Sequence, residues 1–242
     1  MKNVIFTVKE NKKIAKNTYE MLLSGDTDGI FPGQFVNVTL DGFYLRRPIS
    51  VCDVSAGMLT IIYKAVGDGT EKMALMAGGE RLDVLTGLGN GYDTAPSGNF
   101  PLLIGGGAGV PPMYLLAKKL ISEGKSVGVI LGFGSSDEVF YKEEFEALGA
   151  RVAVTTVDGT AGIRGFVTDA MDLFEYTYFY TCGPEPMLKA VYDKSRTDGQ
   201  FSFEERMGCG FGACMGCTCK TKYKNKRICK DGPVLEKGEI VW

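Results

Sequence analysis

Over roughly the first 94 residues, the chain shows short runs in which hydrophobic and polar positions alternate, separated by Gly and Asn. Alternation with a period of two is typical of β-strands that bury one face. Six runs show it, and the only helical stretch among them is Thr70–Met76. The predicted strands are Val4–Val8, Tyr19–Leu23, Gln34–Leu40, Ile49–Val54, Leu59–Val66 and Arg81–Leu85. This pattern predicts a six-stranded antiparallel β-barrel.

A linker of small and polar residues, Ala95–Asn99, separates this region from one with a different pattern. Beyond it, apolar runs alternate with amphipathic stretches, which predicts strands and helices in turn. The predicted strands are Leu102–Ile104, Val127–Leu131, Val152–Val157 and Tyr178–Thr181, and the predicted helices are Met113–Ile121, Lys142–Leu148, Val167–Phe174 and Met187–Lys194. This order favours a Rossmann-like α/β domain, with a parallel sheet covered by helices on both faces.

The segment from about Phe201 to Trp242 is short and rich in Gly, Cys and Lys. It is too small for a core of its own, so we expect it to fold around a metal centre. The expected organisation is therefore a barrel over residues 1–97, an α/β domain over 98–200 and a C-terminal subdomain over 201–242.

Composition narrows the class of protein. At 242 residues and 45% hydrophobic content, the chain can form two compact units. Its net charge of -2 gives no general attraction for nucleic acid, and no apolar run approaches the roughly 20 residues that a membrane span needs. The first residues alternate like a strand and lack the apolar region of a signal peptide, so we expect a cytoplasmic protein.

The cysteines predict a metal site. Five of the seven lie in one C-terminal segment, unlike a disulfide framework spread through a secreted fold. Cys209, Cys214, Cys217 and Cys229 follow the C-x4-C-x2-C…C spacing of ferredoxin 2Fe-2S clusters, with glycines between them. The alternatives are a structural zinc site or buried free thiols, and Cys219 is expected to be a packed spectator. The chain has no histidine, which excludes His-based catalysis and His-ligated zinc, haem or Rieske centres.

A run of cations surrounds the last of these cysteines: Lys220, Lys222, Lys224, Lys226, Arg227 and Lys230. We expect a solvated hairpin tip between Cys219 and Cys229. The alternative is that these charges offset the negative charge of a cluster or steer a docking partner.

A glycine-rich turn joins a predicted strand to a predicted helix through Gly105, Gly107 and Gly109. Such a turn exposes backbone amides at a helix N-terminus, which suits a pyrophosphate. Pro112 stands where the third glycine of the dinucleotide fingerprint would fall, and proline is well tolerated in a first helical turn. The alternative is a plain tight turn.

A second strand-to-helix turn, Cys182-Gly183-Pro184, follows the last predicted strand of the α/β domain. It falls at the carboxyl edge of the sheet, where open α/β folds bind their ligands. A lone cysteine in this place is otherwise a core residue.

These segments, with Tyr44–Ser50 in the barrel, give the whole chain a close resemblance to the electron transfer subunits of class B dihydroorotate dehydrogenases, within the ferredoxin reductase superfamily. The matching stretches are Pro32–Phe35, Arg47–Ser50, Ile62–Lys64, Gly69–Thr70, Gly87–Gly91, Gly105–Pro112, Cys182–Pro184, Glu204–Cys217 and Cys229–Pro233. The resemblance implies an oxidoreductase of pyrimidine biosynthesis that carries FAD and a 2Fe-2S cluster and uses NAD(H). It further implies a partner, an FMN-containing catalytic subunit that oxidises dihydroorotate, in a heterotetramer of two plus two.

The resemblance also implies which residues hold the flavin. Arg47 suits the FAD pyrophosphate and Ser50 offers a hydroxyl to the isoalloxazine, with Pro48 and Ile49 between them. The Gly69-Thr70 pair, expected just before a helix, gives backbone amides to the flavin phosphates. The residues implied to line the flavin from the adjacent strand are Ile62, Tyr63 and Lys64. Otherwise Arg47 is a surface ion pair and Thr70 an ordinary N-cap.

For the nucleotide, the resemblance implies that NADH docks through Gly105, Gly107, Gly109 and Pro112 and through Gly183 and Pro184, with Cys182 as the catalytic residue. The segment Gly132–Glu138 carries acidic groups and no arginine for a 2′-phosphate, so NADH is expected to be preferred to NADPH. Arg46 receives no role.

Three other functions remain open on the sequence alone. One is the small subunit of a bifurcating NADH-dependent ferredoxin:NADP oxidoreductase or sulfide dehydrogenase, which shares this domain order. A second is an oxygenase reductase, although its ferredoxin domain needs a longer gap than the eleven residues before Cys229. A third is a non-catalytic ferredoxin-like carrier or flavin-binding module, which the nucleotide turn disfavours.

Overall fold

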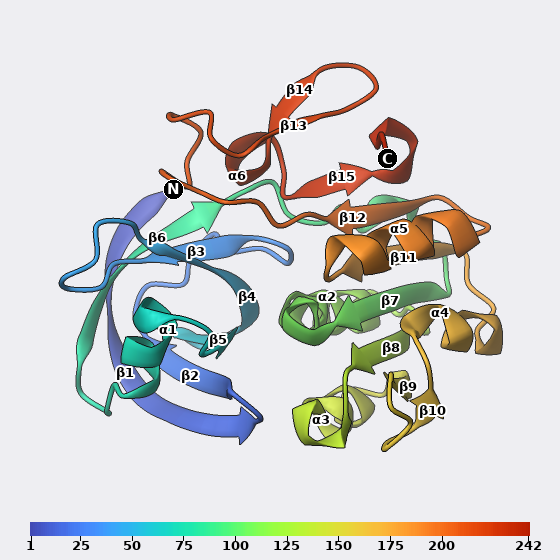
Figure 1. Ribbon diagram of the computed structural model, residues 1–242, viewed down its shortest axis with the longest axis horizontal. Coiled ribbons are helices and arrows are strands. Elements are labelled where there is room, and N and C mark those ends of the chain that lie inside the picture. The colour runs from blue at the N-terminus through green and yellow to red at the C-terminus, as the bar shows by residue number, and fades with distance from the viewer.

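The N-terminal part of the computed structural model, which describes all residues from Met1 to Trp242, is a closed antiparallel barrel (Figure 1). Its strand order is β1-β2-β5-β4-β3-β6. The strands are β1 (Lys2–Ala15), β2 (Thr18–Ser24), β3 (Phe35–Val38), β4 (Arg47–Ser55), β5 (Met58–Lys64) and β6 (Arg81–Leu88). Alternate side chains such as Phe6, Val8, Val36 and Val38 are fully buried inside it. The predicted barrel is confirmed, because the period-two pattern fills its interior.

The one helix of the barrel region, α1 (Asp68–Ala74), begins two residues before the predicted start at Thr70. Gly67 is its N-cap, so Gly69 and Thr70 lie inside the first turn. Both the expectation that this pair precedes the helix and the alternative that Thr70 caps it were wrong. The Thr70 hydroxyl instead receives hydrogen bonds from the backbone N–H groups of Val66 and Gly67, at 3.0 and 3.3 Å.

The second part is a seven-stranded sheet in the order β10-β9-β8-β7-β11-β12-β15, parallel except for the last pair. The strands are β7 (Pro101–Gly106), β8 (Gly128–Phe133), β9 (Arg151–Thr156), β10 (Ile163–Arg164), β11 (Tyr178–Cys182), β12 (Gly199–Ser202) and β15 (Val234–Glu236). Helices α2 (Pro111–Ser122) and α3 (Lys142–Ala147) cover one face, and α4 (Val167–Ala170) and α5 (Glu185–Lys194) cover the other. The expected α/β domain is confirmed.

Several short elements were not predicted. Strands β10, β12 and β15 are two to four residues long, and the predicted helix Val167–Phe174 is α4 followed by a 3-10 turn, Met171–Leu173. The linker Ala95–Asn99 contains a further 3-10 turn, Ala95–Ser97.

The C-terminal segment lies along the top of both other parts in Figure 1. It forms the hairpin β13 (Thr218–Lys220) and β14 (Asn225–Arg227), then α6 (Ile228–Asp231) and strand β15. Most of its buried apolar side chains, among them Cys217 and Ile228, belong to the hydrophobic cluster on the α4–α5 face of the sheet, and Val234 belongs to the cluster on the other face. The segment therefore has no separate core, which agrees with its composition.

The barrel and the α/β domain share a packed and cross-linked boundary. Cys52 of β4 and Ile62 of β5 lie in the same hydrophobic cluster as the buried face of α2. Lys118 of α2 forms an ion pair with Asp53 of β4 at 2.6 Å. The Tyr141 hydroxyl donates to a Glu20 carboxylate oxygen at 2.7 Å. These contacts fix the α/β domain against β2, β4 and β5. No helix of the protein is both long and apolar enough to cross a membrane.

Candidate cofactor sites

The candidate flavin residues on β4 and α1 come together although they are far apart in the sequence. A Cβ atom added to Gly69 would lie 2.2 Å from Nε of Arg47, so the guanidinium rests directly on the first turn of α1. The same guanidinium lies 4.6 Å above the Phe43 ring and donates to the Leu45 carbonyl. Arg47 makes no ion pair with a carboxylate. A cation held beside helical N–H groups is suited to an anion such as a pyrophosphate.

The other predicted flavin residues differ in where their side chains point. Ser50 lies opposite Phe35 of β3, and Pro48 lies opposite Asn37. Ile49 packs against the barrel core. Ser50 is half-buried on the strand that faces α2, where its hydroxyl has no protein partner.

On β5, three neighbouring residues have three different environments. Ile62 is buried at the boundary with α2. Tyr63 points into the barrel, where its hydroxyl donates to Asn11 Oδ1 at 2.9 Å, so its side chain does not face the boundary. Lys64 reaches the other domain and pairs with Glu138 at 3.3 Å.

A pocket of about 490 Å³ opens at the carboxyl ends of β7, β8 and β9. Of the predicted residues, Lys64, Gly107 and Pro184 line it. The remaining lining residues are Gly106, Gly132, Phe133, Gly134, Glu138, Thr155, Val157, Gly165, Phe166, Val167, Thr168, Pro186, Met187 and Ala190. Four of these, Gly132, Phe133, Gly134 and Glu138, lie in the segment Gly132–Glu138 that was expected to face a 2′-phosphate. Most of the others were not predicted singly, although the rule that α/β folds bind ligands at this edge would have found the loop after β9.

The glycines of the turn after β7 serve different purposes. Gly107 has φ +52° and open space around it, so it needs glycine for its backbone conformation and presents bare backbone to the pocket. A Cβ on Gly109 would lie 2.1 Å from the Cys182 carbonyl oxygen, and one on Gly105 would lie 2.8 Å from Cα of Val110. Gly109 therefore allows the turns after β7 and β11 to pack together, and Gly105 allows the turn after β7 to fold back over the end of its own strand. Pro112 is buried in the first turn of α2.

Cys182 is half-buried at the end of β11, and Gly183 follows it under the Met187 side chain. Burial raises the pKa of the Cys182 thiol to about 12. The residue is therefore an uncharged thiol at neutral pH. That state argues against nucleophilic attack, which needs the thiolate.

The first three predicted cluster cysteines lie in one loop between β12 and β13, and Cys229 lies in α6. The backbone N–H groups of Ala213 and Cys214 point at Cys209 Sγ, at 3.2 and 3.4 Å. Burial opposes ionisation of Cys209, but hydrogen bonds from backbone N–H groups outweigh it and lower its pKa to about 6. The Cys229 N–H points at Cys217 Sγ at 3.4 Å. Amides directed at sulfur are what a thiolate-ligated cluster requires.

The four thiols are arranged as two neighbouring pairs. Cys209 and Cys214 are within hydrogen-bonding reach of each other, and so are Cys217 and Cys229. No three Cys, Asp or Glu side chains of the protein converge as ligands of a single ion. A 2Fe-2S cluster takes two protein ligands on each of two irons, so two pairs of thiols fit it. Cys219 packs half-buried beside them.

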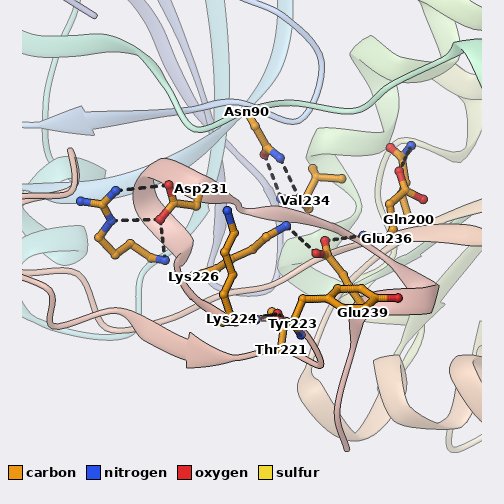
Figure 2. A network of polar contacts seen from close by, with 11 residues as sticks. Asn90, Gln200, Thr221, Tyr223, Lys224, Lys226, Asp231, Val234, Glu236 and Glu239 are labelled. Atoms are coloured by element: carbon orange, nitrogen blue, oxygen red, sulfur yellow. Dashed lines mark hydrogen bonds and ion pairs between the residues drawn. The ribbon is translucent and has the colours of Figure 1, made fainter.

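The hairpin beyond the cluster loop is less solvated than expected. Lys220, Lys222, Lys224 and Lys230 are exposed. Lys226, however, pairs with Glu239 at 2.5 Å, and both side chains are largely buried (Figure 2). Arg227 binds Asp231 at 2.9 Å and donates to the Gly212 carbonyl at 2.9 Å. The prediction of a solvated tip is thus wrong for these two cations, which tie the hairpin down.

Two further contacts attach the C-terminal segment to the barrel. The Asn90 side chain exchanges two hydrogen bonds with the Val234 backbone, at 2.8 and 3.1 Å (Figure 2). Asn37 of β3 donates to the Cys209 carbonyl at 3.3 Å. Arg46, which the sequence left without a role, pairs with Asp83 at 2.9 Å and is a structural residue of the barrel.

Comparisons with known proteins agree with this arrangement. Residues 204–241 match the model of the iron-sulfur cluster binding domain of dihydroorotate dehydrogenase B, and residues 103–193 match the oxidoreductase NAD-binding domain. Among solved structures, the NADH-dependent reduced ferredoxin-NADP oxidoreductase gives a TM-score of 0.89 at 29% identity, over 98% of this chain and 90% of that one. Phthalate dioxygenase reductase gives a TM-score of 0.63 at 20% identity, over 79% of this chain and 64% of that one, and supports the fold alone.

Curated relatives decide the family. The protein of Fusobacterium nucleatum named dihydroorotate dehydrogenase B (NAD(+)), electron transfer subunit, is 46% identical over 97% of this chain and 96% of its own length. The protein of the same name from Bacillus pumilus is 44% identical over 99% of this chain and 98% of its own length. The chain therefore belongs to the family of dihydroorotate dehydrogenase B electron transfer subunits.

Proposed function

We propose that this protein is the electron transfer subunit of an NAD-dependent dihydroorotate dehydrogenase. It carries electrons between NAD(H) and the FMN of a partner catalytic subunit through bound FAD and a 2Fe-2S cluster. The observation that carries this proposal is the order of the three candidate sites. Lys64 at the end of β5 lines the nucleotide pocket, β4 beside it carries Arg47 and Ser50, and β3 beside β4 contacts the cluster loop through Asn37.

This order matches the chemistry that the cofactors supply when bound. NADH gives up two electrons as a hydride, a 2Fe-2S cluster exchanges one at a time, and a flavin does both, so FAD belongs between them. The chain's own residues supply placement. Arg47 and the first turn of α1 hold negative charge, Gly107 lets a nucleotide approach the backbone, and the neutral thiol of Cys182 packs at the sheet edge.

The cluster loop also fits a docking role. Its outer half, Phe211 to Gly216, is exposed apart from Gly212, and it includes the apolar side chains Phe211 and Met215. Cys214 in the same stretch is exposed, which brings one cluster ligand to the surface. We propose that the catalytic subunit docks here, in a heterotetramer of two plus two. We place the complex in the cytoplasm, which agrees with seven unpaired cysteines.

A second candidate function is the small subunit of a bifurcating NADH-dependent reduced ferredoxin-NADP oxidoreductase. The TM-score of 0.89 over almost the whole chain favours it. The sequence identity of 29% to that structure is lower than the 46% to the dihydroorotate dehydrogenase relative, so it stands second.

The proposed function is tested by reconstitution. We expect the isolated chain to reduce dyes with NADH but not to turn over dihydroorotate, because every site described here serves electron carriage. Dihydroorotate:NAD turnover is expected only after co-expression with an FMN-containing catalytic subunit and co-elution from size exclusion. Separate elution of the two proteins, or dihydroorotate oxidation by this chain alone, contradicts the proposal.

A separate variant tests whether the exposed positive charge of the hairpin beside the cluster loop attracts the partner subunit. Lys224→Glu is the appropriate charge reversal for this test, because Lys224 is exposed and makes no ion pair. Lys226 is unsuitable because it pairs with Glu239. Exposed charges mainly affect association rate and its salt dependence.

We also expect NADH to be preferred to NADPH. Glu138 lines the pocket, no arginine does, and the one lining cation, Lys64, is paired with Glu138. A carboxylate near an added 2′-phosphate is repulsive, so kcat/KM for NADH should be about tenfold higher or more. Glu138→Gln should lower the ratio of kcat/KM for NADH to kcat/KM for NADPH. Asp137→Asn is the matched control, since Asp137 pairs with Lys16 and does not line the pocket. Equal or higher kcat/KM for NADPH in the unmodified protein would contradict this and favour the bifurcating function.

A further inference from the structure

Asn37 has an environment that its position in the barrel does not explain. It lies on β3 between Val36 and Val38, which fill the barrel interior, so its own side chain points outward. Outward polar residues of a barrel strand usually meet water. Asn37 is nevertheless only 2% exposed.

The cluster loop is what covers it. Nδ2 of Asn37 donates to the carbonyl of Cys209, the first predicted cluster ligand, at 3.3 Å. The next residue, Gly210, has φ +79°, and a Cβ added there would lie 2.4 Å from the same Nδ2. The loop backbone therefore approaches the carboxamide as closely as a glycine allows.

The barrel side of this contact is rigid. Arg46 donates to the backbone carbonyl of Asn37 at 3.3 Å and is itself fixed by Asp83. Asn37 lies opposite Pro48 of β4, and Ser50 lies opposite Phe35, two residues away on β3. Asn37 thus stands between the strand that carries the candidate flavin residues and the turn that carries the first cysteine.

Stability alone does not account for an asparagine here. Its Oδ1 is buried and has no partner in the protein. An unpaired buried acceptor is destabilising, and a leucine of similar size would avoid that cost. The hydrogen bond to Cys209 is the feature that only a polar side chain supplies.

We propose that Asn37 is a positioning residue for electron transfer between the flavin and the 2Fe-2S cluster. It fixes the Cys209 turn to the barrel strand next to the flavin strand, and so sets the separation and orientation of the two redox centres. One electron passes at a time, and Asn37 itself gains and loses neither electrons nor protons. This inference rests on the proposed function above.

The test compares Asn37→Leu with Asn3→Leu in the holoprotein. Asn3 is the matched control, because it is exposed on β1 of the same barrel and its one side-chain hydrogen bond is a long one, 3.4 Å to Asp83 Oδ2. Arg46 is held by the other carboxylate oxygen, Oδ1, at 2.9 Å, and keeps that partner in N3L. In stopped-flow mixing with NADH, N37L is expected to reduce its flavin at the unmodified rate. Its cluster should be reduced more slowly by about 10- to 100-fold, the usual cost of losing an outer contact of a metal site.

Two readouts do not depend on turnover. The electron paramagnetic resonance spectrum of the chemically reduced cluster should change in N37L, and backbone amides from Gly208 to Gly216 should exchange hydrogen faster. N3L should match the unmodified protein in every measurement. If N37L does not fold, Asn37→Ala carries the same expectation, because it leaves only a small void.

The possible outcomes separate the inference from the function on which it rests. A folded Asn37 variant with unmodified cluster reduction rate and unchanged spectrum overturns the inference while the proposed function stands. An unmodified protein in which NADH reduces the flavin but never the cluster overturns both.

Discussion

Replacing Cys214 with serine is expected to remove iron from the protein while its FAD stays bound. A serine hydroxyl is a harder and far less acidic ligand than a thiol, so it is a poor replacement for a thiolate on iron. Cys214 is the best ligand to change, because it is exposed, whereas Cys217 and Cys229 are buried in a hydrophobic cluster and their loss would also disturb folding. Iron and sulfide should fall at least about tenfold.

The loss of the cluster should affect the two activities differently. Dye reduction by NADH through the flavin is expected to persist, since Arg47 and α1 lie on the barrel and not in the cluster loop. Turnover of dihydroorotate with NAD in the complex should fall about 100-fold or more, because the relay to the partner is broken.

Cys219→Ser is the matched control for this experiment. Cys219 lies two residues after a predicted ligand, packs half-buried in β13, and is outside the two thiol pairs. It should keep its iron. Iron analysis that finds zinc in the unmodified protein, or full iron in C214S, contradicts the cluster assignment.

The parts of the fold that could be predicted from sequence are those with a long periodic signal. The barrel strands and the parallel strands β7, β8, β9 and β11 are each fixed by a pattern of alternating or continuous apolar residues. Strands β12 and β15 have only four and three residues, too few for any period to show. They are strands because β12 pairs with β11 of the existing sheet, and β15 then pairs with β12 at the edge, with Leu235 opposite Phe201.

The candidate sites divide in the same way. The cluster cysteines were predictable because the spacing of the ligands along the chain is itself the signal. Asn37 was not, because its partner Cys209 lies 172 residues away and a polar residue on an outward strand face usually signals solvent. Lys226 was misjudged for a similar reason, since only the fold brings Glu239 to it.

Gly69→Ala is expected to weaken FAD binding. The reason is the contact of Gly69 with Arg47, which no pattern in the sequence indicates. The alanine Cβ would lie 2.2 Å from Arg47 Nε, so the guanidinium must move away from the first turn of α1. A hydrogen bond to a charged group is worth about 1.5–3 kcal/mol, which corresponds to roughly 10- to 100-fold in the dissociation constant of FAD. Arg47→Leu should give a similar loss, and the two changes together should be less than additive because they remove the same interaction.

Gly67→Ala is the matched control on the same helix, since its Cβ would meet nothing within 4 Å and its extended backbone, with φ -175°, accepts any residue. Fluorescence titration of the deflavinated variants measures each constant. Unmodified FAD affinity in G69A, or an equal loss in G67A, would show that Arg47 is not what holds the flavin phosphates.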